Sequence, residues 1–370
     1  MSKKILIFHS SNDLYGASKI LLQVIDILKS NGHEIHVFLP YRGPLDELFY
    51  EKKVILNHLN FGVLRRKYFN FFGLINRTIK ILISIKKITR YIKKNNIDLI
   101  YTNTSIILAS GISAFLCKVP NYTHIHEIPN NNYYSKIMGF FMSNFSSKII
   151  VVSKSVENYW SKFIKKKLTL IYNGIPKLKI QNSKKYPSNK IKFLTVARLL
   201  PYKGHKYIIE LANELLKKIS NLEFIFLGDT FKGYKFYEQE LKSLIKEFGI
   251  EKNIEFVGFD YNVSKYMIQS NFLLHGAVFP DPLPTVIFEA IQHELPVIST
   301  NIGGPVEILD NGRGGLLIPS NDIYKASEKI SKYIFDIELI EKKKKYASDF
   351  ILKEFYEKKF NKKIVKFFNE

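Results

Sequence analysis

Short apolar runs rich in β-branched and aromatic residues alternate with longer amphipathic stretches along most of the chain. The first series is expected to form strands at residues 5–8, 35–39, 54–59, 99–102, 122–126 and 149–152. A second series begins after residue 190, with strands expected at residues 193–196, 224–227, 254–257, 272–275 and 297–299. Regular alternation of strand and helix is typical of a parallel sheet covered by helices on both faces. The sequence therefore predicts an α/β protein with two doubly wound sheets.

The alternation is interrupted once, between the two series. Residues 176–189 (PKLKIQNSKKYPSN) are polar, rich in lysine and carry prolines near both ends, which is typical of a linker. A chain of 370 residues is also too long for one ordinary core. We therefore expect an N-terminal domain over 1–175, a linker over 176–190, and a C-terminal domain over 191–345. A C-terminal helix over 346–370 follows, and whether it crosses back to the first domain is left open.

Several classes of protein are excluded by composition. The single cysteine, Cys117, rules out a disulfide framework and a multi-cysteine metal site, and it favours a reducing compartment. The apolar stretches are too short to span a membrane, and the N-terminus turns polar too early for a signal peptide. The nine histidines show no HExxH spacing, which argues against a zinc hydrolase. We expect a cytoplasmic protein.

The two halves of the chain differ in charge. Residues 1–190 contain 30 Lys and Arg against 9 Asp and Glu, whereas residues 191–370 contain 26 against 24. The N-terminal half either meets an anionic partner or is basic through compositional drift towards lysine. Only 7 of the 56 basic residues are arginine. The few arginines are therefore the better candidates for binding phosphate, because guanidinium offers a planar pair of donors.

Two cations follow the first strand of the second series. The segment VARLLPYKG, residues 196–204, places Arg198 and Lys203 in one loop before a glycine that opens a helix. Two cations beside a helix N-terminus suit an anion such as a phosphate. The alternative is a solvated loop. Lys203 alone would favour that alternative, whereas Arg198 is one of only two arginines in the second half.

Two carboxylates follow a later strand with seven residues between them. Asp281 should lie in a loop, and Glu289 should lie on the second turn of a helix over 285–294. Two such acceptors suit neighbouring hydroxyls, as on a sugar. The alternative is that Asp281 caps the helix and Glu289 lies on the surface, although an unpartnered acid between Phe288 and Ala290 would be costly. Both interpretations stay open on these residues alone.

The first half contains two further candidate segments. In THIHEIP, residues 123–129, strand alternation puts His124 and His126 on one face, with His126 nearest the strand end. We expect His124 to be a packed histidine satisfied by backbone groups. The loop SSNDLYGAS, residues 10–18, contains Gly16 but no GxGxxG, so it is a poor dinucleotide-binding motif.

These motifs together resemble retaining glycosyltransferases of family 4. Members of that family have the GT-B architecture, in which two Rossmann-like domains face a central cleft. The resemblance covers nearly the whole chain and is strongest over 191–320. It is carried, in the family's order, by Asn173-Gly174, Arg198 with Lys203, Asp281 with Glu289, and Gly303-Gly304-Pro305-Val306-Glu307.

The resemblance implies a nucleotide-sugar donor, UDP- or GDP-linked, bound by the second domain. Arg198 and Lys203 would hold the diphosphate, Glu289 the ribose hydroxyls and Asp281 the hydroxyls of the transferred sugar. His126 would sit beside that sugar as a positioning or electrostatic residue. The remaining donor contacts would come from Gly16, from backbone near Val257, and from the N–H groups of Leu283 and Thr285. Family members need no metal, so neither a metal nor another cofactor is expected.

The sequence departs from the family pattern at two positions. The first acid of the pair is usually Glu, and Asp281 is one methylene shorter, which bears on the identity of the donor sugar. A glycine common in the turn after the second acid is replaced by Glu294. We expect that replacement to matter for structure only.

A basic segment of the first half is a candidate for the acceptor side. Residues 52–94 contain 12 Lys and Arg and no acid. Within it, residues 61–72 (FGVLRRKYFNFF) mix three cations with five aromatics, which is typical of binding to an anionic membrane surface. The residues proposed to make this contact are Arg65, Arg66, Lys67, Phe69 and Phe72. The helix expected over 75–92, with Ile75, Ile79, Leu82, Ile88 and Ile92 at helical spacing, is interpreted instead as packed on the sheet.

The favoured function is a retaining glycosyltransferase, transferring a hexosyl or N-acetylhexosaminyl group to a lipid-linked or glycan acceptor. It would act in the synthesis of a bacterial-type cell-surface polysaccharide, lipopolysaccharide or glycolipid at the inner face of the membrane. One alternative is a nucleic-acid-binding protein, against which stand the few arginines and the nearly neutral second half. Another is a GT-B nucleotide-sugar epimerase or phosphorylase, which would bind a similar donor. The oligomeric state is not predicted.

Overall fold

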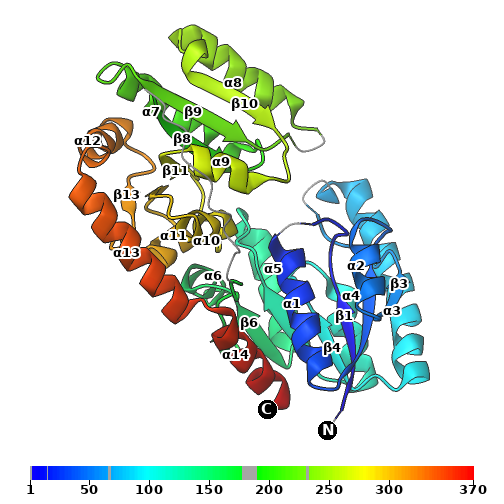
Figure 1. Cartoon of the computed structure of the whole chain (residues 1–370). Helices are drawn as coiled ribbons and strands as arrows, with labels where there is room; N and C mark the ends of the chain where they lie inside the picture. The colour runs from blue at the N-terminus through cyan, green and yellow to red at the C-terminus, as the bar shows by residue number, and fades with distance from the viewer. Residues whose placement is uncertain (1, 15, 66–67, 177–189, 231–232) are drawn as a thin grey trace. The chain divides into compact units, whose positions relative to one another are not determined.

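The computed structural model describes residues 2–14, 16–65, 68–176, 190–230 and 233–370. It divides the chain into two compact units (Figure 1). The first unit comprises Met1–Gly174 and Glu357–Glu370, and the second comprises Ile175–Tyr356. The expected linker over 176–190 lies almost entirely outside the described residues, as do Arg66 and Lys67.

The first unit is built on a parallel sheet of seven strands in the order β3-β2-β1-β4-β5-β6-β7. Its strands are β1 (Lys4–Phe8), β2 (Glu34–Leu39), β3 (Ile55–His58), β4 (Leu99–Thr102), β5 (Asn121–Ile125), β6 (Lys148–Val151) and β7 (Leu168–Leu170). Its helices are α1 (Gly16–Ser30), α2 (Leu45–Glu51), α3 (Phe71–Asn95), α4 (Leu108–Cys117), α5 (Asn132–Phe145), α6 (Lys154–Trp160) and α14 (Glu357–Asn369).

Side-chain alternation along β1 feeds two separate cores. Ile5 and Ile7 pack in one cluster with α1 and the C-terminal helix α14. Leu6 and Phe8 pack in the other, with α3 and α4. Successive residues of a strand point to opposite faces, so a central strand buried on both faces must be continuously apolar. The run ILIF met that requirement and made this strand predictable.

The second unit has a parallel sheet of six strands in the order β10-β9-β8-β11-β12-β13. Its strands are β8 (Ile191–Val196), β9 (Leu222–Leu227), β10 (Ile254–Gly258), β11 (Phe272–His275), β12 (Val297–Thr300) and β13 (Leu316–Ile318). Its helices are η2 (Pro201–Lys203), α7 (His205–Leu216), α8 (Lys235–Phe248), η3 (Glu251–Asn253), α9 (Val263–Gln269), α10 (Thr285–Gln292), α11 (Gly304–Ile308), α12 (Ile323–Tyr333) and α13 (Ile337–Glu354).

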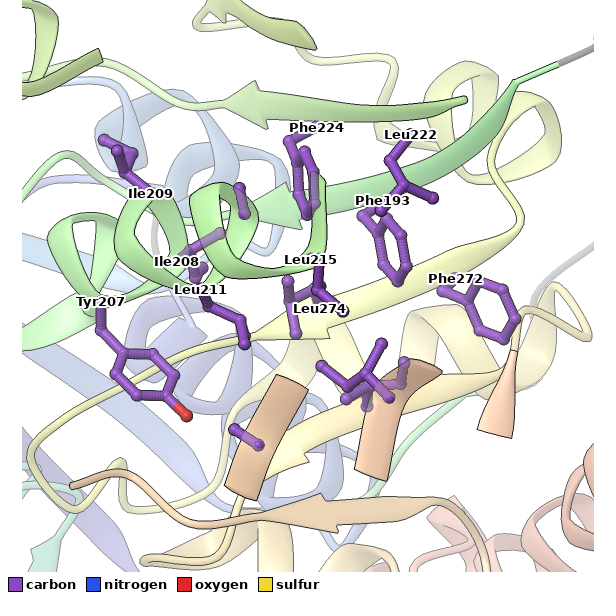
Figure 2. Packing of buried hydrophobic residues seen from close by; sticks show 14 of the residues in the cluster. Phe193, Tyr207, Ile208, Ile209, Leu211, Leu215, Leu222, Phe224, Phe272 and Leu274 are labelled. Carbon is purple, nitrogen blue, oxygen red and sulfur yellow. The ribbon is translucent and has the colours of Figure 1, made fainter. Parts of the chain in front are cut away.

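Aromatic side chains from three neighbouring strands form the centre of the second core. The ring of Phe193 stacks on that of Phe224, with centroids 5.0 Å apart, and on that of Phe272 at 5.4 Å. Helix α7 covers them with Ile208 and Leu215, among other residues (Figure 2). This packing fixes β8 and β11 side by side, so the loops that follow these two strands leave the sheet at the same edge.

The observed sheets confirm the predicted α/β fold. Strands β7 and β13 were not predicted, and each has only three residues. The helical pattern at the C-terminus is broken at Phe355 and Tyr356, between α13 and α14. Helix α14 packs with α1 and belongs to the first unit.

Candidate functional site

The loops after β8 and β11 touch at two glycines of the second unit. Gly204, which ends η2, has φ +78°, a conformation that L side chains rarely adopt. A Cβ atom at Gly204 would lie only 1.8 Å from the carbonyl oxygen of Gly276. Glycine is therefore required for this approach, and the approach brings Lys203 to the loop that contains Asp281.

Lys203, Asp281 and His275 form a polar cluster around one carboxylate oxygen. The ammonium of Lys203 donates to Oδ2 of Asp281, and Nε2 of His275 lies 3.4 Å from the same oxygen. The side chains of Asp281 and His275 are only 10% and 7% exposed. Burial raises the pKa of Asp281, but the charge of Lys203 and the hydrogen bond and charge of His275 outweigh it, so the pKa lies well below its usual range. Asp281 is therefore an ionised, partnered carboxylate.

Glycines of the GGPVE motif clamp the Asp281 loop from the other side. Gly304 donates its N–H to the carbonyl oxygen of Asp281 at 2.7 Å. Gly303 has φ +72°, and a Cβ there would lie 2.6 Å from the same oxygen, whereas a Cβ at Gly304 would lie 2.3 Å from the oxygen of Pro282. The motif therefore fixes the position of the loop, which explains physically why two adjacent glycines stand there.

Arg198 and Glu289 lie on the segments that follow β8 and β11, the two strands whose loops touch. Arg198 follows β8, and its neighbours Ala197 and Leu199 donate to the carbonyls of Leu227 and Asp229 at 3.0 and 3.1 Å. The side chains of Arg198 and Glu289 are both half-buried. These two hydrogen bonds continue the pairing of β8 with β9 past Arg198 and hold its backbone in line with the sheet. It also places Glu289 on the second turn of α10, as predicted.

Asp281 is not the cap of α10. The N-cap is Pro284, which has no side-chain hydrogen bond to the helix, and α10 begins at Thr285. The capping alternative for Asp281 is therefore wrong. The expected helix over 285–294 ends at Gln292, and Glu294 follows with φ +55°. A glutamate thus occupies a left-handed position that glycine adopts without strain.

The backbone positions expected to contact the donor also lie at strand and helix ends. Strand β10 pairs with β9 up to Phe256 and again at Gly258, so Val257 sits in an irregularity of the ladder. Such a bulge leaves its extra residue outside the regular pairing. Leu283 is buried just before α10, and Thr285 is the first helical residue, whose N–H has no partner within the helix ladder.

His126 of the first unit belongs to a chain of polar side chains on the residues that directly follow β1, β4 and β5. Nε2 of His126 lies 2.8 Å from Oδ1 of Asn103. Nδ2 of Asn103 lies 3.1 Å from Nδ1 of His9, whose Nε2 lies 3.0 Å from the hydroxyl of Ser18. Asn103 also donates to the carbonyl of Ala17 at 3.4 Å. Only an NH₂ group can face a carbonyl, so this contact orients the amide.

The oriented amide determines the tautomers of both histidines. Because Oδ1 of Asn103 accepts, His126 carries its proton on Nε2; because Nδ2 donates, His9 carries its proton on Nε2 as well. Burial lowers the pKa of His9 to about 4. Burial holds the pKa of His126 well below its usual range, and repulsion from His124 and His9 in their charged forms lowers it further. The imidazole of His126 is therefore neutral, with Nδ1 as its acceptor.

His124 and His126 share one face, as predicted, with ring centroids 4.1 Å apart. His124 is fully buried, and burial lowers its pKa to about 3. Its Nδ1 is bonded to the hydroxyl of Tyr101 at 2.6 Å. The expected backbone partner is therefore a side chain instead.

Other motif residues of the first unit lie at element boundaries. Gly16 is the first residue of α1. Asn173 is buried, and a Cβ at Gly174 would lie 2.7 Å from Cβ of Phe360 on α14. The Asn-Gly motif thus packs against the C-terminal helix at the point where the first unit ends.

The aromatic and basic segment of the first unit has two sides. Phe61 is fully buried, whereas Phe69 is 45% exposed and Phe72 80% exposed. The guanidinium of Arg65 donates to the carbonyl of Ser10 at 2.8 Å and to the hydroxyl of Tyr41 at 3.2 Å. Arg65 therefore ties three loops together in addition to any surface role.

Helix α3 is only partly the packed helix that the sequence predicted. Ile88 and Ile92 are buried, but Ile75, Ile79 and Leu82 are 45%, 52% and 62% exposed. Arg77 is buried among them, with its guanidinium 3.9 Å from the ring centroid of Tyr68. Within the described residues, no helix is both long enough and apolar enough to cross a bilayer.

Sequence reasoning missed His275 and Asn103. Both lie at the carboxyl end of a strand, His275 as the last residue of β11 and Asn103 directly after β4. The rule that ligands bind beyond these strand ends could have identified them. Their partners, however, come from segments distant in sequence, which periodicity does not reveal.

Two family models match consecutive stretches of the chain. Residues 15–177 match the family model described as Glycosyltransferase Family 4, and residues 176–350 match the model described as Glycosyl transferases group 1. The capsular polysaccharide biosynthesis glycosyltransferase CapH of Staphylococcus aureus is 28% identical over 58% of this chain. The match spans 63% of the length of CapH. An uncharacterized glycosyltransferase of Haemophilus influenzae is 22% identical over 88% of each chain.

Among solved structures, HepE of Anabaena in complex with UDP-glucose is similar over 99% of both chains. The TM-score is 0.82 at 21% sequence identity, a likeness that concerns the fold. The two parallel sheets, the order of the motifs and the two family models agree. The chain belongs to the family 4-type glycosyltransferases of GT-B architecture.

Proposed function

We propose that this protein is a retaining glycosyltransferase that uses a nucleotide-sugar donor. The observation that carries the proposal is the contact of Lys203 with Asp281, which joins the loops that follow the neighbouring strands β8 and β11. Two cations suited to a diphosphate, Arg198 and Lys203, follow one of these strands, and two carboxylates suited to hydroxyls, Asp281 and Glu289, follow the other.

In the proposed reaction, the bond between the anomeric carbon and the diphosphate oxygen breaks while an acceptor oxygen bonds to the same face of that carbon. The leaving phosphate oxygen takes the acceptor's proton. Negative charge develops on the diphosphate as the bond breaks. Arg198 and Lys203 would interact more strongly with that developing charge than with the ground state, which accelerates the step. These side chains would supply the positive charge, so the proposal includes no metal ion.

We assign Glu289 to the ribose hydroxyls and Asp281 to the transferred sugar. The irregularity at Val257 would offer backbone groups to the base, and the N–H groups of Leu283 and Thr285 would lie near sugar and phosphate. We further assign Gly16 to the diphosphate and His126 to an electrostatic role in the reaction. Since HepE was solved with UDP-glucose, a UDP-hexose is the first donor to test, followed by UDP-N-acetylhexosamines and GDP-sugars.

The acceptor is proposed to be lipid-linked or glycan, in the synthesis of a cell-surface polysaccharide or glycolipid. CapH is named for capsular polysaccharide biosynthesis, which supports this assignment. The protein would then act at the cytoplasmic face of the membrane as a peripheral protein. Lipopolysaccharide synthesis is a second setting for the same reaction.

The outer face of α3 supports a membrane contact of the first unit. Its N-terminal half exposes apolar side chains, and its C-terminal half exposes cations. The apolar set is Phe71, Phe72, Leu74, Ile75, Ile79, Leu82 and Ile83. The cationic set is Lys86, Lys87, Arg90, Lys93 and Lys94. Apolar side chains next to a basic cluster suit the interface of an anionic bilayer.

The donor is tested by a thermal-shift screen with UDP-, GDP-, ADP- and dTDP-sugars. A bound donor stabilises the folded protein by mass action, by about 2.7 kcal/mol at a concentration of 100 times Kd. We expect one nucleotide series to raise Tm, and turnover with that series to give a glycosidic product of retained configuration. A product of donor epimerisation or phosphorolysis would support the alternative GT-B activities. No shift with any nucleotide-sugar would contradict the proposal.

A further inference from the structure

The carboxylate of Glu127 accepts hydrogen bonds from two loops of the first unit. Its Oε1 accepts from the hydroxyl of Thr104 at 2.8 Å, and from both the backbone N–H and the hydroxyl of Ser105 at 2.6 Å. Its Oε2 accepts from the backbone N–H of His126 at 3.0 Å. Thr104 and Ser105 come after β4, and His126 comes directly after β5. The carboxylate therefore links the loops that leave two neighbouring parallel strands at the same edge of the sheet.

Both oxygens of this side chain act as acceptors. A backbone N–H can only donate, and Ser105 directs one at Oε1 whereas His126 directs one at Oε2. An ionised carboxylate accepts at both oxygens, but an amide of the same shape accepts on one side and donates on the other. Glutamine therefore cannot reproduce the contacts of Glu127.

The backbone of Glu127 is held in place as well. Its carbonyl accepts the indole N–H of Trp160, on α6, at 2.9 Å. Trp160 is fully buried, and Thr104 and Ser105 are nearly so. Hydrogen bonds to an ionised group are stronger than those between neutral groups. Glu127 is thus a firm link between the two loops.

These two loops carry the two partners of the contact between Asn103 and His126. Asn103 directly precedes Thr104, and its Oδ1 lies 2.8 Å from Nε2 of His126. His126 directly precedes Glu127, which binds its N–H. The same carboxylate thus holds the chain on both sides of the contact. A shift of either loop would turn the imidazole and move its acceptor, Nδ1.

The pairing of the strands does not depend on Glu127. Residues 100–102 of β4 pair with residues 121–123 of β5. The hydroxyl of Thr102 also donates to Oδ1 of Asn121 at 2.8 Å. Glu127 lies beyond this pairing, so the contacts of its carboxylate fix the two loops rather than the strands.

We propose that Glu127 is a positioning residue of the transfer reaction. Its carboxylate holds His126 by the backbone N–H, and Asn103 through the two residues that follow it, so that the imidazole keeps one place and one orientation. This inference rests on the proposed function, in which His126 has an electrostatic role in the reaction. Glu127 acts through His126 and is assigned no contact with the donor.

Glu127→Gln tests this assignment. The carbonyl of the amide should take the side where three donors converge, which puts its NH₂ group against the N–H of His126, donor against donor. The loop after β4 should therefore stay in place, and His126 should be released. We expect kcat with the UDP-sugar that gives turnover to fall by about 10- to 100-fold, the range for losing a hydrogen bond to a charged group. The Kd for that UDP-sugar, measured by calorimetric titration, should change little, because the charged residues assigned to the donor belong to the second unit.

A double variant with His126→Ala separates positioning from a merely structural role. If Glu127 acts through His126, its replacement has no further effect once the imidazole is gone. We expect kcat of the double variant to equal that of His126→Ala within about twofold. The matched control is Asp98→Asn, since Oδ2 of Asp98 accepts the backbone N–H of Lys4 at 2.7 Å at the opposite edge of the same sheet. The control should keep the kcat of the wild type.

Melting temperature and the fluorescence of Trp160 report whether Glu127→Gln folds. If it does not fold, Thr104→Val combined with Ser105→Ala keeps Glu127 and its bond to His126 but removes two of the donors to Oε1. This substitute should lower kcat by about 3- to 10-fold. The loss should again vanish in the His126→Ala background.

A loss of kcat that depends on His126 supports the inference. Three results would overturn it while the transferase activity stands. They are wild-type kcat in the folded Glu127 variant or its substitute, wild-type kcat in His126→Ala, and losses that multiply in the double variant. Absence of transfer by the wild type from any nucleotide-sugar would overturn the proposed function and this inference with it.

Discussion

The two units place their charges in opposite ways. The first unit exposes a basic cluster on α3, made of Lys86, Lys87, Arg90, Lys93 and Lys94, but its polar centre of His9, His124 and His126 is buried and neutral. The second unit is nearly neutral outside, but its polar centre holds the ionised pair of Lys203 and Asp281. Burial alone thus drives an ionisable group to its neutral form, whereas a partner of opposite charge keeps it ionised.

The largest effect is expected from a substitution in the proposed diphosphate site of the second unit. Arg198→Ala should remove charge-assisted contacts to the diphosphate and lower turnover by about 30-fold to several thousandfold, or about 2–5 kcal/mol. Thermal stability is measured alongside turnover. The matched control is Arg313→Ala, since Arg313 is 67% exposed and pairs with Asp310 at 3.2 Å. Equal activity of the two folded variants would remove Arg198 from the site.

The second prediction concerns acid. The folded state lowers the pKa of His9 from 6.5 to about 4 and that of His124 to about 3. The unfolded chain therefore binds these protons first, and stability is lost as the pH falls from about 6.5 to about 4. His9 alone accounts for about 3 kcal/mol. We expect the first unit to open before the second during acidification.

Trp160 makes this comparison measurable, because it is the single tryptophan of the chain and lies buried in the first unit. Its fluorescence reports that unit, while hydrogen exchange of peptides reports the second. In the second unit, burial also lowers the pKa of His205, to about 3. The pKa of Asp281 is depressed, however, so its ion pair with Lys203 persists well below pH 4. Opening of the second unit at the higher pH would contradict the prediction.

The third prediction separates the outer face of the first unit from that of the second. Phe71→Ser with Phe72→Ser should weaken binding to anionic vesicles by about 2 kcal/mol, even in high salt, because these side chains are 72% and 80% exposed. Co-sedimentation across a salt series measures this. The matched control changes Phe335 and Ile337 of the second unit, which are 61% and 74% exposed.

Replacing Lys86, Lys87 and Lys93 with Gln should remove instead the salt-sensitive part of vesicle binding, roughly 1 kcal/mol for each lysine at the surface. Donor binding should stay the same in all of these variants. Failure of the wild type to bind anionic vesicles at low salt would attribute the basic surface to compositional drift.

The smallest expected effect concerns which part of the donor is bound by each of the two carboxylates of the second unit. Glu289→Gln should weaken nucleoside diphosphate and nucleotide-sugar alike, by about 1.5 kcal/mol. Asp281→Asn should weaken the nucleotide-sugar but spare the free diphosphate, since the substitution releases Lys203. Calorimetric titration of both variants with both ligands measures the split. Identical losses in all four titrations would refute this assignment.

The sequence predicted elements whose signal is local. Alternation and buried runs identified most strands, and the motifs at their ends made Arg198, Lys203, Asp281 and Glu289 the candidates for donor binding. Contacts between distant segments could not be predicted from the sequence. They include the pairing of Lys203 with Asp281, the contact of His275 with the same carboxylate, and the contacts of Gly303 and Gly304 with the Asp281 loop. The periodicity of α3 also misled, because an apolar residue at helical spacing can face solvent when the helix is apolar on more than one side.

The most direct test of the account is hydrogen exchange of the full chain with and without the nucleotide-sugar that raises Tm most. Protection is expected to be greatest over residues 198–204 and 281–289, where the loops after β8 and β11 carry the proposed donor contacts. The same experiment with Arg198→Ala should lose most of that protection, and with Arg313→Ala should retain it. Protection confined to other segments, with these two unchanged, would contradict the assignment of the donor site to the second unit.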